Sequence, residues 1–210
     1  MTQRLVEGVI PVNANIAKPA VFDLQDAGDT RPITTAGVGL PAHATVTATE
    51  HGNGVIHQTV LTLAATPVTM RDTEQGGGIK IYDFPAGRIL FLGASGSIQV
   101  TTTSAIATTL KAAKTCNWGV GTTTQASATV ATTEQDLLQV AAFTSSATIN
   151  VAPVTAPGVG AAIVTPYDGT ATPIDAYLNL AIAGAGDIDG NATTTTTGTI
   201  TLNWINLGTL

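Results

Sequence analysis

A period-two alternation of apolar and polar residues recurs in short segments after Pro41, and it constrains the fold more than any other feature. It is clear in residues 44–50 (ATVTATE), 54–63 (GVIHQTVLTL) and 174–183 (IDAYLNLAIA). Such alternation is typical of a β-strand with one face in a core and one in solvent. About eight to ten short strands at spacings of roughly 8–12 residues predict an all-β domain, either a jelly roll or a β-sandwich.

The stretch 78–93, GIKIYDFPAGRILFLG, is predicted to form the centre of the core. Residues 79–82 alternate, residues 84–87 contain the turn formers Pro and Gly, and residues 88–92 are almost continuously apolar. We expect a hairpin whose second strand is buried on both faces. Three of the nine aromatic residues of the chain lie in this stretch, namely Tyr82, Phe84 and Phe91.

Turn residues predict how the other segments connect. Asn53-Gly54 is a strong hairpin signal between residues 44–50 and 54–63. The run 75–78 (QGGG) and the pair Ser95-Gly96 are predicted as turns. Residues 174–183 and 193–207 are predicted to form a C-terminal hairpin around a turn at 184–191. Cys116–Thr124 is predicted as a strand with glycine bulges, and Thr148–Val151 and Ala161–Thr165 as short strands.

Helical signals are few. Residues 105–114 (AIATTLKAAK) are the best helix candidate, although Thr108 and Thr109 weaken it. Residues 132–138 are predicted to include one short helical turn capped by Thr132 or Thr133.

Residues 1–40 are predicted to be an extended arm, and residues 41–210 the β domain. Proline residues interrupt the first segment at three positions, and its apolar residues occur in small groups. We expect such a segment to lie along a surface of its own domain or of a neighbouring chain; the alternative is a disordered segment. On a neighbouring chain, the predicted interface anchors are Val9, Ile10, Val21 and Phe22.

Charge is sparse and unevenly distributed. Charged residues make up 10% of the chain, against roughly 25% in an average soluble domain. A surface with little charge is easily desolvated, which suits permanent contacts with other subunits. All eight Lys and Arg residues lie at or before Lys114, and every charged residue after this position is Asp or Glu. The sequence therefore argues against binding of nucleic acid by the second half.

Two acidic residues form the strongest candidate for a metal site. Asp187 and Asp189 alternate before Gly190, as at the start of a calcium loop. Gly190 falls at the fourth position instead of the sixth, however, and Gly198 stands where the loop requires Glu. The flanking strands favour a turn at this position, and calcium binding by Asp187 and Asp189 is the weaker interpretation.

The remaining candidate sites have simpler structural explanations. His51 and His57 are a conceivable metal pair without an evident third ligand, so they are expected to be ordinary surface histidines. Trp118 and Trp204 are expected in the core rather than on a sugar-binding platform. The single cysteine, Cys116, is expected to be buried and unreactive. Neither a phosphate-binding loop nor a G-x-S-x-G motif is present. We therefore expect neither an enzyme nor a cofactor.

The segments CNWGVGTTTQASATVATTEQDLL (116–138) and DAYLNLAIAGAGDIDGNATTTTTGTITLNWINLG (175–208) resemble virion structural proteins of tailed bacteriophages. The greatest similarity is to capsid decoration, or cement, proteins. The resemblance implies a β-rich virion protein that binds the outside of the capsid, commonly as a homotrimer, and bridges neighbouring subunits of the major capsid protein. It supplies no catalytic residue.

Other functions stay open at this point. A tail-fibre or receptor-binding β module would recognise host glycans, and a main capsid shell subunit would assemble particles unaided. Neither a signal peptide nor a membrane-spanning run is evident in the sequence. We therefore expect synthesis in the cytoplasm of a bacterial host, a final location on the capsid surface of the virion, and no membrane or nucleic-acid partner.

Overall fold

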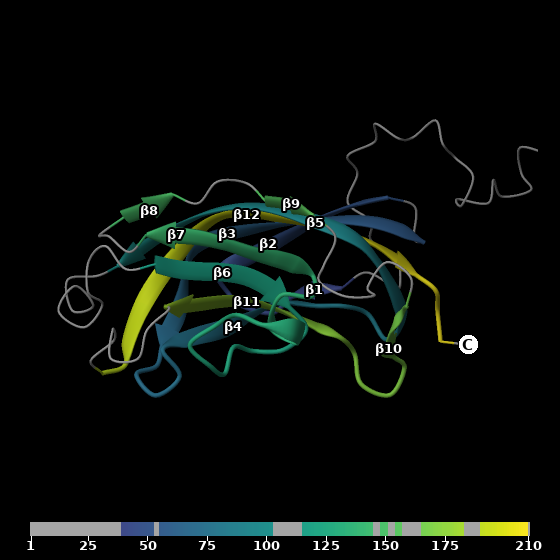
Figure 1. Cartoon of the computed structure of the whole chain (residues 1–210). Coiled ribbons are helices and arrows are strands. Elements are labelled where there is room, and N and C mark those ends of the chain that lie inside the picture. The colour runs from purple at the N-terminus through teal and green to yellow at the C-terminus, as the bar shows by residue number, and fades with distance from the viewer. Residues whose placement is uncertain are drawn as a thin grey trace, which may run out of the picture.

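The computed structural model describes residues 39–52, 55–102, 115–144, 148–150, 154–156, 165–182 and 190–209. Two antiparallel sheets pack face to face as the two layers of a β-sandwich (Figure 1), which confirms the predicted all-β class. In this part of the chain the only helical element is η3 (Thr132–Glu134), a single 3-10 turn. None of the described segments is a helix long and apolar enough to cross a membrane.

Sheet A contains five strands in the order β1-β4-β11-β6-β7. Their bounds are Leu40–Pro41, Gly76–Asp83, Asp175–Ile182, Thr115–Gly121 and Leu138–Thr144. The strand β11 is therefore central, between β4 and β6.

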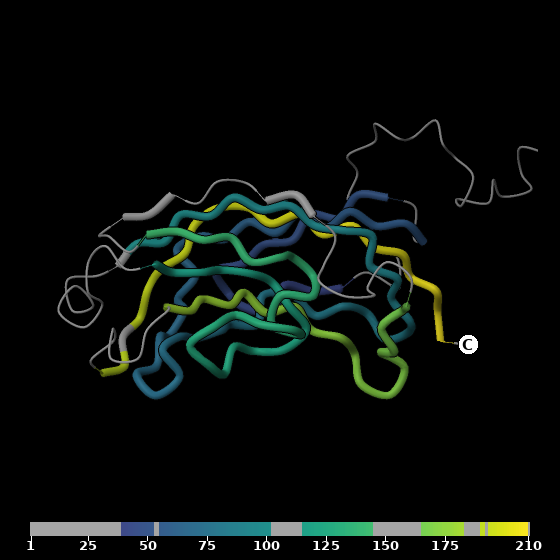
Figure 2. The backbone as a smooth tube through the Cα atoms, viewed as in Figure 1, coloured from purple at the N-terminus to yellow at the C-terminus, as the bar shows by residue number. Residues whose placement is uncertain are grey.

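Sheet B has a main path in the order β10-β5-β12-β3-β2, and the short strands β8 and β9 also pair with β5. The bounds of the main path are Tyr167–Gly169, Gly87–Thr102, Ala192–Asn206, Ile56–Met70 and Val46–Gly52. Those of β8 and β9 are Thr148–Asn150 and Val154–Ala156. The strand β12 pairs with both β3 and β5 along nearly its whole length, and this central position can be followed in Figure 2.

The core lies between the sheets, where both contribute aromatic and branched side chains. The region 78–93 supplies several of its members, which confirms its predicted place at the centre. Cys116 is also buried, as predicted. The fully enclosed aromatic side chains are Tyr82, Phe91, Trp118 and Trp204.

Two predicted hairpins are wrong. The strand β4 lies in sheet A and β5 in sheet B, so residues 84–86 carry the chain from one sheet to the other. The same holds at the C-terminus, where β11 lies in sheet A and β12 in sheet B. Alternation identifies a strand with a buried face, but it does not identify the strand with which it pairs.

The strand β5 is buried on one face only, which corrects the prediction for residues 88–92. Phe91 is fully buried, whereas Leu92 is 39% exposed on the opposite face. At Gly93 the φ angle is 146°, and the register with β12 shifts at this point. This bulge allows the strand to continue through the predicted turn at Ser95-Gly96.

The predicted turn at residues 75–78 is also wrong, because its three glycines belong to β4. A Cβ atom at Gly77 would lie 1.8 Å from the carbonyl oxygen of Thr69 on β3. At Gly78 a Cβ atom would lie 2.3 Å from Oδ1 of Asn179 on β11. These glycines permit close approach of neighbouring groups and do not serve as a flexible turn.

The hairpin of β2 and β3 is confirmed, with Gly52 opposite His57. The strand predicted at residues 116–124 corresponds to β6 and the one at 148–151 to β8. The helix predicted at 105–114 and residues 161–164 of another predicted strand lie outside the described residues, as does nearly all of the predicted arm.

Candidate functional site

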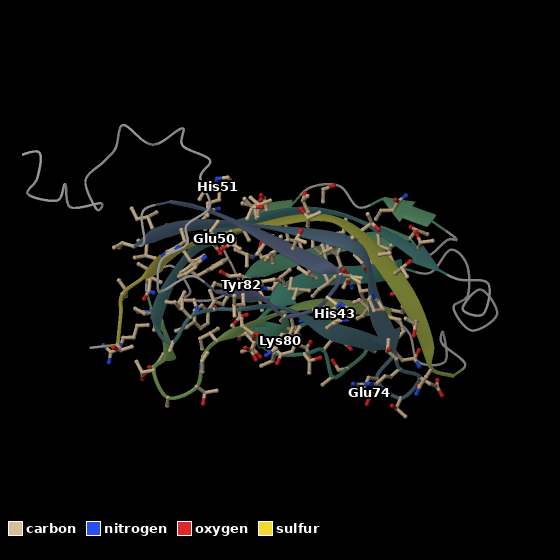
Figure 3. The ribbon with its side chains drawn as sticks, turned by 180° about the vertical axis from the view of Figure 1, so that it is seen from behind. His43, Glu50, His51, Glu74, Lys80 and Tyr82 are labelled. Atoms are coloured by element: carbon tan, nitrogen blue, oxygen red, sulfur yellow. The ribbon has the colours of Figure 1, made fainter. Side chains whose placement is uncertain are left out.

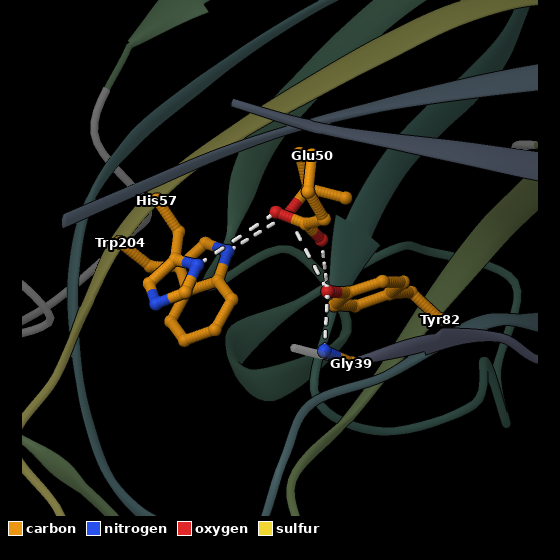
Figure 4. Close-up of polar contacts among 6 residues, drawn as sticks. Gly39, Glu50, His57, Tyr82 and Trp204 are labelled. Atoms are coloured by element: carbon orange, nitrogen blue, oxygen red, sulfur yellow. Dashed lines mark hydrogen bonds and ion pairs between the residues drawn. The ribbon is translucent and has the colours of Figure 1, made fainter. Parts of the chain in front are cut away.

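A continuous chain of hydrogen bonds crosses the core between the two sheets (Figure 4). The indole N–H of Trp204 donates to Thr59 Oγ1 over 2.8 Å, and the Thr59 hydroxyl donates to Glu50 Oε1 over 2.7 Å. The Tyr82 hydroxyl donates to the same carboxylate oxygen. It also accepts a hydrogen bond of 3.0 Å from the backbone N–H of Gly39. Because Tyr82 belongs to sheet A and Glu50 to sheet B, the chain of bonds joins the sheets.

His57 completes this group, hereafter the Glu50 cluster (Gly39, Glu50, His57, Thr59, Tyr82 and Trp204). Its ring stacks on the indole of Trp204 with a centroid separation of 3.9 Å and an interplanar angle of 6°. Nδ1 of His57 lies 3.8 Å from Oε2 of Glu50, a distance longer than a hydrogen bond. The imidazole therefore packs as a flat ring beside the carboxylate. It is buried, which corrects the prediction of a surface histidine.

The Glu50 cluster is closed to solvent. Glu50 is 4% exposed and His57 is 1% exposed. Burial, followed by the negative charge of Glu50, raises the pKa of Tyr82, so its phenol remains a hydrogen-bond donor at neutral pH. The arrangement is suited to fixing one sheet on the other and to holding Gly39 at the start of β1.

The Glu50 cluster was not predicted, although the sequence contained a signal for it. In residues 46–50 the alternation places Glu50 on the same face as Val46, which is buried. His57 likewise shares a face with Thr59 and Leu61. A carboxylate at an inward position requires buried donors, but the sequence does not indicate that Tyr82 of the other sheet supplies one.

A second polar group fastens the loop 122–137 to the outer face of sheet A. Asn179 of β11 accepts a hydrogen bond of 2.8 Å from the backbone N–H of Gln125. Its amide group donates to the carbonyl oxygens of Thr123 and Glu134 over 2.9 and 2.8 Å. This side chain is fully buried and pairs with backbone groups from both ends of the loop.

Two carboxylates hold the loop itself together. Glu134 accepts from the backbone N–H groups of Ala126 and Ala131, each over 2.9 Å. Ala131 is the N-cap of η3, so the predicted Thr cap is wrong. Asp136 accepts from both the backbone N–H and the hydroxyl of Thr122 over 2.8 Å. Burial raises the pKa of Asp136, against these hydrogen bonds.

The outer face of sheet B is nearly free of charge. Of the Asp, Glu, Lys and Arg residues that the structure describes, only Arg88 points outward from strands β2, β3, β5 and β12. Glu50 of β2 points into the core. The outward side chains are mainly small and neutral, for example Thr47, Thr49, Gln58, Thr62, Ser97 and Thr199.

One end of this face carries a cluster of apolar side chains, hereafter the apolar row (Ile56, Leu90, Leu92, Ile205 and Leu207). Ile205 of β12 lies opposite Ile56 of β3 on one side and Leu90 of β5 on the other. The exposed fractions of Ile56, Leu92 and Leu207 are 52%, 39% and 45%. Three neighbouring strands thus present branched side chains to solvent at the same level of the sheet.

The residues predicted for the arm interface and the calcium loop lie outside the described part of the chain. They are Val9, Ile10, Val21, Phe22, Asp187 and Asp189. Their predicted roles therefore stay predictions.

The predicted alternatives at the histidines and tryptophans can be assessed. His51 stands opposite the exposed Gln58, whereas the neighbouring His57 is buried, so the conceivable metal pair lies on opposite faces of sheet B. The third histidine, His43, lies apart from His51 (Figure 3), and its Nδ1 is 2.9 Å from the hydroxyl of Thr45. No group of three His, Cys, Asp or Glu residues that could hold a metal occurs within the described ranges. Trp118 and Trp204 are fully buried, which confirms their predicted place in the core and leaves neither ring open to a sugar.

Comparison with known proteins gives no relative: no protein-family model, curated protein or solved structure matches this chain.

Proposed function

We propose that this chain is a bacteriophage head decoration protein. In this proposal it binds the outside of the capsid, acts as a homotrimer, and stabilises contacts between neighbouring subunits of the major capsid protein. Its final location is the virion, after synthesis in the host cytoplasm.

The outer face of sheet B is the observation that carries the proposal. It extends over the three longest strands, which have 15 or 16 residues each. Among Asp, Glu, Lys and Arg, its only described residues are Arg88 and, opposite it on the edge strand β10, Asp168. Charge is depleted at the centre of protein interfaces, because burying a charge is costly. A rigid sandwich with such a face is suited to a passive structural role in a shell.

The interior of the molecule supports the same proposal. Its ionisable side chains are used to join the sheets, as in the Glu50 cluster, or to fasten the loop 122–137. Each of these carboxylates is occupied by donors from the chain itself. This distribution favours a structural protein over an enzyme.

The predicted arm adds a second contact in this proposal. Val9, Ile10, Val21 and Phe22 would anchor it on a neighbouring subunit, where backbone hydrogen bonds to a sheet edge supply affinity. Many identical weak contacts on one shell then add up by avidity.

Cosedimentation with shells tests the proposal. The full-length protein is mixed with shells assembled from the major capsid protein of the same virus, without this chain. We expect saturable binding and a rise in the temperature at which the shells dissociate. A protein that leaves shells unbound but binds specific host glycans on an array would instead be a receptor-binding module.

Deletion of residues 1–38, which keeps Gly39 and β1, separates the contribution of the arm. We expect the truncated protein to stay folded and to lose most of its binding to shells. Binding equal to that of the full chain would contradict the role of the arm without contradicting the decoration function.

A further inference from the structure

We infer that the outer face of sheet B, centred on the apolar row, binds a second copy of this chain. The inference goes beyond the proposed function: contact between two outer faces of sheet B pairs copies about a twofold axis, in addition to the contacts within the proposed homotrimer. It concerns self-association alone, so it can be tested in the absence of any shell.

The apolar row has the composition of an interface centre. Its five members are branched aliphatic residues on β3, β5, β12 and the segment after β12, with three of them at least 39% exposed. Polar residues border it, among them Gln58 and Asn203, whose amide groups are 3.1 Å apart, and the charged Arg88 two residues before Leu90. Protein interfaces typically combine an apolar centre with a polar rim. Contiguous exposed apolar patches indicate such contacts, whereas single exposed residues do not.

The charge distribution favours a second copy as the occupant. The whole chain carries a formal net charge of −6, so two copies repel unless their acidic groups stay apart. Apart from the buried Glu50, the described charges outside this face lie on sheet A, in the turn 71–75 and in the loop 122–137. When two outer faces of sheet B meet, the only acidic side chain that the structure describes there is Asp168 at the edge of the sheet, and it stands opposite Arg88, whose charge has the opposite sign.

The size of the face is also sufficient. Three strands of about 15 residues, each residue rising about 3.3 Å and the strands about 4.8 Å apart, cover roughly 700 Å². A stable interface uses roughly 800 Å² on each partner. The shorter strand β2 extends the face further, so a second copy can bury a standard interface area here.

Substitution of Leu92 tests the inference in the full-length protein. Leu92 points outward, so a lysine at this position can reach solvent in an isolated subunit. In an interface between two copies it introduces like charges into an apolar centre. We expect Leu92→Lys to raise the dissociation constant of self-association about tenfold or more, as substitutions at interface centres do. Sedimentation velocity over a range of concentrations measures this constant.

Val140 provides the matched control. It is 37% exposed, close to the 39% of Leu92, but lies on β7 of sheet A. We expect Val140→Lys to leave the dissociation constant unchanged. Ile56→Lys, on the neighbouring strand of the apolar row, is expected to weaken association as Leu92→Lys does. Circular dichroism and thermal unfolding confirm that each variant is folded.

The outcomes separate this inference from the proposed function. A monomeric wild-type protein at high micromolar concentration overturns the inference, as does an oligomer that Leu92→Lys leaves intact. In the latter case, loss of shell binding in Leu92→Lys assigns the face to the shell. Conversely, an oligomer that Leu92→Lys dissociates, but that never binds shells, supports the inference and contradicts the decoration function.

Discussion

The hydroxyl of Tyr82 donates a hydrogen bond to the carboxylate of Glu50, and this bond connects sheet A with sheet B inside the core. Both side chains are nearly inaccessible to solvent. The carboxylate also accepts from Thr59, and the phenol also accepts from the backbone of Gly39. Loss of one member therefore removes a hydrogen bond from buried groups on both sides of the core, which is more costly than the loss of one exposed hydrogen bond.

Removal of the Tyr82 hydroxyl is expected to destabilise the fold. The substitution Tyr82→Phe keeps the ring in the core but deprives Glu50 of a donor and Gly39 of an acceptor. We expect the free energy of unfolding to fall by about 1–3 kcal/mol, the range for buried groups left unsatisfied. Urea denaturation followed by circular dichroism measures the change.

Tyr177→Phe is the matched control for this prediction. The Tyr177 hydroxyl also donates to a carboxylate, that of Asp175, over 3.1 Å, but this pair is only partly buried. We expect a change within about 0.5 kcal/mol, as for most surface substitutions. Equal decreases in the free energy of unfolding of the two variants would show that burial does not make the hydrogen bonds of the Glu50 cluster more stabilising than an exposed one.

The glycines of β4 yield a prediction of steric origin. In Gly77→Ala the new Cβ atom would meet the carbonyl oxygen of Thr69, so one backbone must move. We expect a loss of about 3 kcal/mol, at the upper end of the usual cost of overpacking. Gly119→Ala serves for comparison, because its nearest contacts of 3.2 Å demand only small shifts. A milder effect at Gly77 than at Gly119, in thermal unfolding, would contradict the close approach of β3 and β4.

The sequence was sufficient to predict strands, the all-β class and much of the core, because each depends on local alternation. The sequence was insufficient to predict which strands pair with one another. The residues 84–86 and 184–191 have the turn formers of a hairpin, yet both connections pass from one sheet to the other. Local composition favours a bend there, but the choice of partner strand depends on packing between segments distant in the sequence.

In the candidate sites, too, local alternation predicts the direction of a side chain but not its partners. The inward position of Glu50 follows from the alternation in β2, whereas its partner Tyr82 follows from the packing of two sheets. The apolar row has outward residues on three strands, and each alone is an ordinary exposed side chain. Only the register of Ile205 with Ile56 and Leu90 brings them together.

Asp136 predicts how stability depends on pH. Its pKa is raised above the ordinary value of 3.8 because burial disfavours the carboxylate. The folded protein therefore binds a proton here more readily than the unfolded chain, and the free energy of unfolding falls as pH rises through the interval between the two pKa values. We expect the stability of the wild type relative to Asp136→Asn to decrease with rising pH in that interval and to be constant above it.

Asp168 supplies a control of opposite sign. Hydrogen bonds from the Thr170 hydroxyl and backbone N–H lower the pKa of this exposed carboxyl. The stability of the wild type relative to Asp168→Asn is therefore expected to increase as pH rises toward the ordinary pKa of 3.8. Denaturant titrations between about pH 2.5 and pH 7 measure both differences, with sampling centred on the pKa range usual for aspartate. If the two stability differences changed with pH in the same direction, burial at Asp136 and hydrogen bonding at Asp168 could not be the causes of the pKa shifts.

The response of self-association to salt distinguishes an uncharged interface from one built on ion pairs. Salt shortens the range of charge–charge interactions to about 10 Å at 0.1 M and about 3 Å at 1 M. An interface held by ion pairs weakens under this screening. Between two outer faces of sheet B there is almost no charge to screen, whereas repulsion between the acidic groups elsewhere on each copy decreases. We therefore expect the dissociation constant to stay constant or to fall as sodium chloride is increased from low to molar concentration. Sedimentation velocity on the wild-type chain measures this dissociation constant. A steep rise of the dissociation constant with salt would mean that charged residues outside this face hold the copies together.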